Sequence, residues 1–199
     1  QAWQNITHSP ICEGYGLTES SPVVTMNPPN AIQLGTVGLP IPDTHLRLLD
    51  DMGQDVALGE VGELWIQGPQ VMKGYWRDAE ATADAISYDG WLKTGDMALI
   101  QNDGYIKIVS RKKDMILVSG FNVYPSEIEE VTLSHTGILD CAAVGVGDFK
   151  AGESVRLFVV KKDPYLTEDD IIEHLKKELA VYKIPRSIVF IDNIPRSKL

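Results

Sequence analysis

Residues 89–130 read DGWLKTGDMALIQNDGYIKIVSRKKDMILVSGFNVYPSEIEE, and the chain changes character within this stretch. The net charge is −9 up to Ser110 and −1 from Arg111 onward, and the change falls at a short basic run that continues to Lys113. A shift in charge balance at such a run is typical of a boundary between domains. The stretch therefore predicts two domains with a hinge at residues 111–114.

The sequence before this boundary has the pattern expected of short strands separated by turns. Residues 46–49 and 63–67 alternate apolar and polar side chains, and turn sequences rich in Asp, Asn and Gly lie between such segments. The clearest unit is a hairpin with strands at 97–100 and 105–109. Many short strands with frequent turns predict a β-barrel-like subdomain over residues 1–110.

The part after the boundary alternates strands with helices. A proline in the first turn and a capping-box pattern from Ser126 to Glu129 predict a helix at 125–134. An apolar stripe predicts a second helix at 167–180, and Thr167 is its expected N-cap because its hydroxyl can accept a backbone N–H. The order β-α-β-β-α-β predicts a small α+β domain over residues 115–199, so the chain as a whole is assigned to the α+β class. The four expected strands lie at 115–118, 138–146, 155–160 and 187–191.

Composition bounds the classes of function. The 199 residues are 44% hydrophobic with a net charge of −10, which is typical of soluble proteins and argues against nonspecific binding to nucleic acid. The two cysteines, Cys12 and Cys141, are far apart and predict buried, reduced thiols in a cytoplasmic protein. The sequence shows no signal peptide and no membrane-spanning run. Both ends interrupt a pattern, so we expect a fragment of a longer protein.

A glycine-rich segment near the start combines groups that suit a nucleotide. Gly14, Tyr15, Gly16, Thr18 and Glu19 offer close backbone approach, an aromatic face, a hydroxyl and a carboxylate within six positions. A hydroxyl can bond a phosphate oxygen, and a carboxylate can hold Mg²⁺ beside it. The spacing alone favours the simpler alternative, a surface turn with Thr18 as a helix N-cap.

Three further positions are candidates on weaker grounds. Asp96 follows a glycine at the start of a strand and could accept both hydroxyls of a ribose, or could be a solvated turn residue. Arg111 could bind phosphate or ribose, or simply belong to a linker between domains. Gly120 could let the chain pass close to a ligand tunnel, or serve a tight turn.

The order of the motifs along the chain favours the functional interpretation of all of these sites. The segments at 14–20, 62–76, 90–96, 110–116 and 120–129 together resemble the signature series of the adenylate-forming enzymes, a superfamily that includes acyl-CoA synthetases, firefly luciferase and adenylation domains of peptide synthetases. The resemblance runs from about residue 13 to the last residue. Within the superfamily, residues 69–76 and 113–125 are most similar to bacterial long-chain fatty acid–CoA ligases.

The resemblance implies a two-step reaction in which a fatty carboxylate attacks the α-phosphate of Mg²⁺-bound ATP, and coenzyme A then displaces AMP. By matching position, Tyr15 and Gly16 would lie at adenine, Thr18 at phosphate and Glu19 at Mg²⁺. The remaining matched positions would be Asp96 and Arg111 at the ribose, Lys113 at the hinge of a mobile C-terminal domain, and Gly120 at the pantetheine tunnel.

Two elements of the family pattern fall outside the sequence. The phosphate loop belongs upstream of Gln1, and the adenylation lysine belongs just beyond Leu199, so Lys198 does not match it. We therefore expect this chain to be inactive alone. Two alternatives remain open, namely a relative that activates an aryl or a short- or medium-chain acid and a non-catalytic nucleotide-binding module. A fatty substrate is compatible with peripheral membrane contact, and the sequence makes no prediction of oligomeric state.

Overall fold

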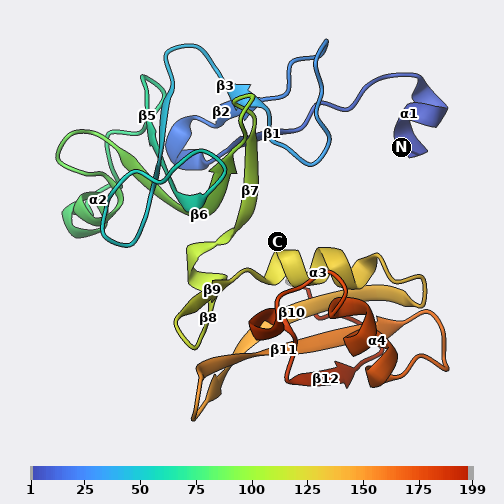
Figure 1. The fold of residues 1–199 in the computed structure, drawn as a ribbon. Coiled ribbons are helices and arrows are strands. Elements are labelled where there is room, and N and C mark those ends of the chain that lie inside the picture. Colours follow the sequence, from blue (N-terminus) through green and yellow to red (C-terminus); the bar gives the residue numbers. More distant parts are fainter. Residues whose placement is uncertain (1, 197–199) are drawn as a thin grey trace. The chain divides into compact units, whose positions relative to one another are not determined.

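The computed structural model describes residues 2–196, which divide into two compact units, Gln1–Lys112 and Lys113–Leu199. Figure 1 shows the helices and strands of both units. Each unit has its own hydrophobic core. The α+β class expected from the sequence is confirmed.

The first unit consists mainly of two antiparallel sheets. The larger is a meander in the order β4-β5-β6-β7, and the smaller runs β1-β2-β3. Both sheets are open, and neither closes into a barrel within the described residues. The helical pieces are α1 (Ala2–Thr7), η1 (Thr18–Ser20) and α2 (Ala79–Ala85). The strands are β1 (Gly14–Gly16), β2 (Val23–Met26), β3 (Leu39–Pro40), β4 (His45–Leu49), β5 (Val61–Gln67), β6 (Leu92–Ile100) and β7 (Ile106–Arg111).

Strand β5 shows why the meander folds as it does. Its residues alternate between partly exposed and buried, so that Leu64 and Ile66 are fully enclosed. They pack with Leu92 of β6 and Ile106 of β7 in one cluster. Alternation of this kind is what the pleat of a strand imposes when one face meets a core. The side chains on the other face of β5 therefore remain partly exposed.

The second unit is a sheet packed against two helices. Its strands run in the order β10-β11-β8-β9, and β12 joins β11 in parallel, while the other pairs are antiparallel. Figure 1 shows α3 and α4 beside this sheet. The two helices contribute Ile128, Ile171 and Leu175 to its core. The short helix η2 (Lys112–Asp114) spans the boundary between the two units. The elements that follow are β8 (Ile116–Val118), β9 (Phe121–Val123), α3 (Pro125–Leu133), β10 (Ile138–Asp148), β11 (Gly152–Lys161), α4 (Glu168–Leu175), η3 (Val181–Lys183) and β12 (Ser187–Phe190).

Helix α4 begins as the sequence predicts and ends earlier. Thr167 accepts a hydrogen bond from the Asp170 amide while the Asp170 side chain accepts one from the Thr167 amide, which is a complete capping box. The helix ends at Leu175 and not near Ala180. The amides of residues 177 and 178 bond carbonyls three residues back, which tightens the chain into turns.

One other expectation from the sequence was wrong, and some short elements were missed. Strand β9 and helix α2 were not foreseen, because three-residue strands and seven-residue helices carry too little periodicity to be recognised. Cys12 is exposed, because it lies in irregular chain before β1, whereas Cys141 is buried as expected. Both thiols are free, and burial raises the pKa of Cys141 to about 12.

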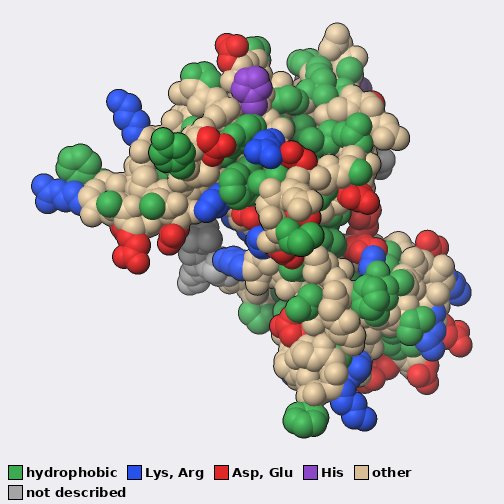
Figure 2. Space-filling model, turned by 60° about the vertical axis from the view of Figure 1, so that its left-hand side comes forward, with side chains coloured by type: hydrophobic (Ala, Val, Ile, Leu, Met, Phe, Trp, Pro, Cys, Tyr) green, Lys and Arg blue, Asp and Glu red, His purple; other side chains and the backbone are tan. Residues whose placement is uncertain are grey.

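The surface mixes all side-chain types. Acidic and basic side chains are interspersed on the face shown in Figure 2, with hydrophobic side chains between them. No helix in the described part of the chain is long and apolar enough to cross a bilayer. No single type of side chain therefore dominates the face that Figure 2 shows.

Separate cores predict separate responses to mutation. Replacing the fully buried Leu157 with alanine should destabilise the second unit by about 2–5 kcal/mol, because it leaves a cavity in the sheet. Leu139→Ala is the control, since that leucine is 64% exposed and should cost under about 0.5 kcal/mol. Urea unfolding followed by near-ultraviolet circular dichroism measures both, and equal losses for the two variants would contradict the assignment of Leu157 to the core.

Candidate functional site

A buried carboxylate organises the first unit. Asp96 on β6 lies directly opposite Arg111 on β7, and its side chain is 5% exposed. The Nε of Arg111 lies 2.9 Å from its Oδ1. The Asp96 amide donates to the hydroxyl of Thr94, which in turn donates to the Leu64 carbonyl, so the backbone around the aspartate is held as well. Strand pairing therefore brings two of the predicted ligand-binding residues together.

Tyr15 completes this cluster from the other sheet. Its hydroxyl donates a 2.5 Å hydrogen bond to Oδ2 of Asp96, although the two residues are 81 positions apart. Burial raises the pKa of Tyr15 well above its ordinary value, and the hydrogen bond and negative charge of Asp96 add to the effect. The phenol therefore remains protonated at neutral pH and donates to the carboxylate. We call Tyr15, Asp96 and Arg111 the carboxylate cluster.

The glycines beside Tyr15 serve the approach of two backbones. A Cβ at Gly16 would lie 1.6 Å from the Pro22 carbonyl oxygen, and one at Gly14 would lie 2.9 Å from the Thr25 carbonyl oxygen. Any side chain at Gly16 would therefore push β1 away from β2 and displace Tyr15 from Asp96. A hollow of about 200 Å³ lies along this strand pair, where a planar group could approach the backbone.

Thr18 and Glu19 lie on the tight turn that follows β1. The Ser20 hydroxyl holds this turn, because it accepts from the Leu17 amide and donates to the Leu17 carbonyl. Thr18 is exposed, and Oε1 of Glu19 accepts a 2.9 Å hydrogen bond from the Tyr75 hydroxyl. The turn thus presents a hydroxyl and an oriented carboxylate close in sequence to the carboxylate cluster.

The fit of a metal ion can be tested against these residues. Among residues 2–196 no group of three or more His, Cys, Asp and Glu side chains is arranged to hold a metal. A Mg²⁺ ion, however, commonly uses one or two carboxylates and takes its remaining ligands from phosphates and water. Glu19 can supply one such carboxylate, so the residues fit a magnesium–nucleotide complex and not a metal held by protein alone.

The other two candidates belong to the second unit and are not part of this cluster. Lys113 is exposed and begins that unit. Gly120 is exposed in the two-residue turn that joins β8 to β9, where Ser119 and Gly120 have φ values of 51° and 85°. Two successive positive φ values match a tight hairpin turn, and this local geometry alone accounts for a glycine.

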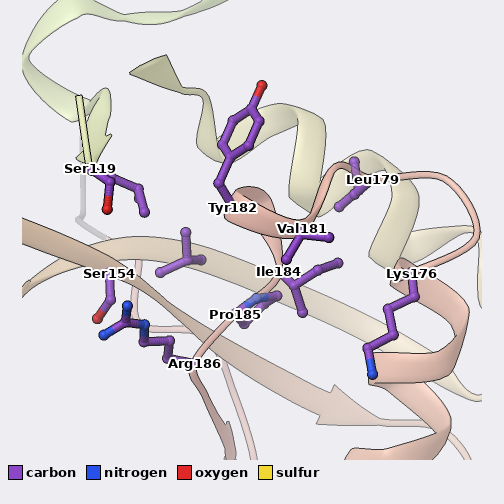
Figure 3. Close-up of a pocket in the computed structure, with 11 residues that line it drawn as sticks. Ser119, Ser154, Lys176, Leu179, Val181, Tyr182, Ile184, Pro185 and Arg186 are labelled. Atoms are coloured by element: carbon purple, nitrogen blue, oxygen red, sulfur yellow. The ribbon is translucent and has the colours of Figure 1, made fainter. Parts of the chain in front are cut away.

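A hollow of about 470 Å³, which no sequence pattern indicated, adjoins this turn. Ser119 lines one part of it, and chain segments far from the turn supply the rest. Figure 3 shows Lys176 and Arg186 on opposite sides, with Ile184 and Pro185 between them. An apolar floor with a cation on each side suits a ligand that carries anionic groups.

Tyr75 and Thr94 were also not predicted from the sequence, because their roles depend on contacts between residues far apart in the chain.

Two family models match the chain. The model described as AMP-binding enzyme matches residues 1–76, and the model described as AMP-binding enzyme C-terminal domain matches residues 127–199. The long-chain-fatty-acid--CoA ligase of Yersinia pestis is 50% identical over 200 residues, which cover 100% of this chain and 35% of the relative. The chain therefore spans about a third of the length of the curated relatives it matches.

Solved structures agree with the sequence relatives. ATP-bound MatB from Rhodopseudomonas palustris is 35% identical with a TM-score of 0.91, and the match covers 98% of this chain and 39% of that one. o-Succinylbenzoate CoA synthetase (MenE) from Bacillus subtilis, in complex with its acyl-adenylate intermediate, is 31% identical with a TM-score of 0.86. That match covers 98% of this chain and 40% of that one.

The burial of the carboxylate cluster predicts unequal effects of two similar mutations. Tyr15→Phe removes a donor from a buried carboxylate and should cost about 1–3 kcal/mol of unfolding free energy. Tyr75→Phe removes the same kind of bond from Glu19, but Tyr75 is 40% exposed, and water replaces the lost donor, so the cost should stay below about 0.5 kcal/mol. Denaturant titration of the two variants measures this, and a larger loss for Tyr75→Phe would contradict the assigned burial.

The raised pKa of Tyr15 predicts a loss of stability at alkaline pH. The folded state holds the phenolic proton more tightly than the unfolded state, so its contribution is complete below about pH 10 and declines as the pH rises toward the folded pKa. Unfolding at pH 9, 10 and 11 should show a steeper decline for the unaltered chain than for Tyr15→Phe. Parallel curves would mean that Tyr15 titrates as an ordinary tyrosine.

Proposed function

The chain belongs to the family of AMP-binding enzymes, and on that premise we propose that it is part of a ligase that joins a long-chain fatty acid to coenzyme A with ATP. The observation that carries the proposal is the 50% identity, over the whole chain, to a long-chain-fatty-acid--CoA ligase. The carboxylate cluster and the adjoining turn supply groups of the kind that a nucleotide needs. We propose a cytoplasmic enzyme whose contact with membranes is at most peripheral.

The proposed reaction has two steps. In the first, an oxygen of the fatty carboxylate attacks the α-phosphorus of ATP, a new O–P bond forms, and the bond to the β-phosphate breaks, which releases pyrophosphate. In the second, the thiol sulfur of coenzyme A attacks the acyl carbon and the C–O bond to AMP breaks, while the thiol proton passes to solvent. Neither step needs a covalent bond to protein, so the protein contributes positioning and charge stabilisation.

We assign the nucleoside to the carboxylate cluster. Because the Tyr15 hydroxyl is bonded to Asp96, its ring is held in one orientation, and that ring can lie against adenine beside Gly16. Each Asp96 oxygen already accepts one hydrogen bond and can accept another from a ribose hydroxyl. Asp96 is buried whereas the Arg111 side chain is 51% exposed, so we expect a ribose to approach the carboxylate beside the guanidinium.

We assign the phosphates to the turn after β1. The exposed Thr18 hydroxyl can donate to a phosphate oxygen, and Glu19 can ligate Mg²⁺ through its carboxylate. When bound, Mg²⁺ neutralises charge on the phosphates during phosphoryl transfer. The hydrogen bond from Tyr75 holds the Glu19 carboxylate in place, which makes Tyr75 a supporting residue for this part of the site.

We assign the second step to residues of the second unit. Lys113 stands at the start of that unit and is the proposed hinge about which it turns between the two steps. Gly120 has no side chain to obstruct a pantetheine arm at its exposed turn. The cations Lys176 and Arg186 in the neighbouring hollow are of the right charge for phosphates of coenzyme A.

A second candidate substrate class has a specific observation in its favour. MenE is named as an o-succinylbenzoate CoA synthetase and matches this chain with a TM-score of 0.86, so the same framework accommodates an aryl acid in that protein. The higher identity to the long-chain ligase, 50% against 31%, favours the fatty acid for this chain. Both candidates share the adenylate chemistry described above.

A panel of acids separates these candidates. The enzyme that carries this segment, at the full length of its relatives, should form acyl-CoA from C12–C18 acids with a kcat/KM at least about tenfold above that for C2–C6 or aryl acids. The measurement is ATP-dependent thioester formation with each acid in turn. Preference for an aryl acid would establish the alternative, and ATP binding without any acyl-adenylate would overturn the proposed activity altogether.

A further inference from the structure

Lys112 is the last residue of the first unit and makes two ion pairs within that unit. Its Nζ lies 3.0 Å from Oε2 of Glu63 on β5 and 3.3 Å from Oδ1 of Asp51 in the turn before it. The Glu63 side chain is 13% exposed and the Asp51 side chain is 69% exposed. The pair with Glu63 is therefore the stronger one, because water and salt screen the other.

The registers of three strands show that this contact holds the end of β7 from a second side. Glu63 lies opposite Met97, and Met97 lies opposite Ser110, which defines one row across β5, β6 and β7. Side chains alternate along a strand, so Glu63, opposite Met97, and Asp96, which directly precedes Met97, lie on opposite faces of the sheet. Lys112 lies just beyond β7, in η2, and contacts Glu63 on its face. Arg111 is on the opposite face, where it pairs with Asp96.

The electrostatics keep Lys112 charged. Partial burial by itself lowers the pKa of its ammonium, but the hydrogen bonds and charges of Glu63 and Asp51 outweigh this, and the pKa is raised. The next residue, Lys113, is exposed and belongs to the second unit. Arg111 and Lys112 thus make ion pairs on opposite faces of the larger sheet of the first unit, whereas Lys113 belongs to the second unit.

We propose that Lys112 is a positioning residue that fixes where the joint between the units begins. Together with the Arg111–Asp96 pair, its contact with Glu63 holds the C-terminal end of β7 in place. Rotation of the second unit is then confined to Lys113 and the residues that follow it. A hinge confined to few residues gives a defined movement, whereas a longer flexible segment also loosens what precedes it. Here the preceding residue is Arg111, so loss of Lys112 also disturbs the carboxylate cluster.

Hydrogen exchange on this 199-residue chain tests the anchoring without any substrate. Lys112→Met and Glu63→Gln should each speed exchange of the amides of residues 109–111 roughly threefold, because each loses the same ion pair. The double variant should be no faster than either single one, since the two side chains act as a pair. Lys112→Arg should restore slow exchange, and far-ultraviolet circular dichroism checks that every variant is folded.

Lys162→Met is the matched control, because it removes one positive charge from an exposed lysine of the second unit. It should leave exchange at residues 109–111 unchanged. Equal exchange in Lys112→Met and in this control would overturn the anchoring, and so would additive effects of the Lys112 and Glu63 variants.

Kinetics then test the consequence for catalysis, which rests on the proposed function. In the full-length enzyme, Lys112→Met should slow thioester formation from a preformed acyl-adenylate about fivefold more than it slows adenylate formation, and Lys112→Arg should remove the difference. Equal effects on both steps would overturn the link to domain movement while the exchange result still supports the anchor. Absence of ligase activity in the unaltered enzyme would overturn the proposed function and leave the anchor to be judged by exchange alone.

Discussion

The structure of the candidate site depends on the buried carboxylate of Asp96. A charged group that is shielded from water is costly unless donors surround it, and here Tyr15 and Arg111 supply them. These donors come from β1 and β7, so satisfying one side chain fixes the relation of two sheets in the first unit. Gly16 is part of the same constraint, because any side chain there would separate β1 from β2 and move Tyr15.

The consequences extend along β7 to the end of the first unit. Arg111, the last residue of β7, pairs with Asp96, and Lys112, which follows the strand, pairs with Glu63, so the proposed ribose site and the proposed hinge are adjacent in sequence. In the second unit, the turn that carries Gly120 is equally well defined by its backbone, and it adjoins a hollow with a cation on each side. The proposed two-step reaction uses these features in order.

How far the sequence alone leads differs between fold and site. Alternation of apolar and polar residues predicted β4 and β5, and local strand and helix signals predicted most of the second unit. Thr167 correctly marked the start of α4, because an N-cap is a local signal. The short elements β9 and α2 were not predicted, because they contain too few residues to show a periodic pattern of apolar side chains. The partners of Tyr15 and Glu19 also escaped, since they lie 81 and 56 positions away and only the folded chain brings them together. The motif order selected the candidate residues without their contacts, and the ligand-binding roles of those residues stay predictions.

The central claim is that Asp96 binds the ribose of a nucleotide, and it can be tested with AMP and its 2′,3′-dideoxy analogue. Affinities are measured by calorimetry on the enzyme that carries this segment at full length, on its Asp96→Asn variant, and on Asp103→Asn as an exposed control. Removing both hydroxyls should weaken binding about 10–100-fold in the unaltered and control proteins and less than about threefold in Asp96→Asn. The same loss in all three proteins would show that Asp96 does not contact the ribose.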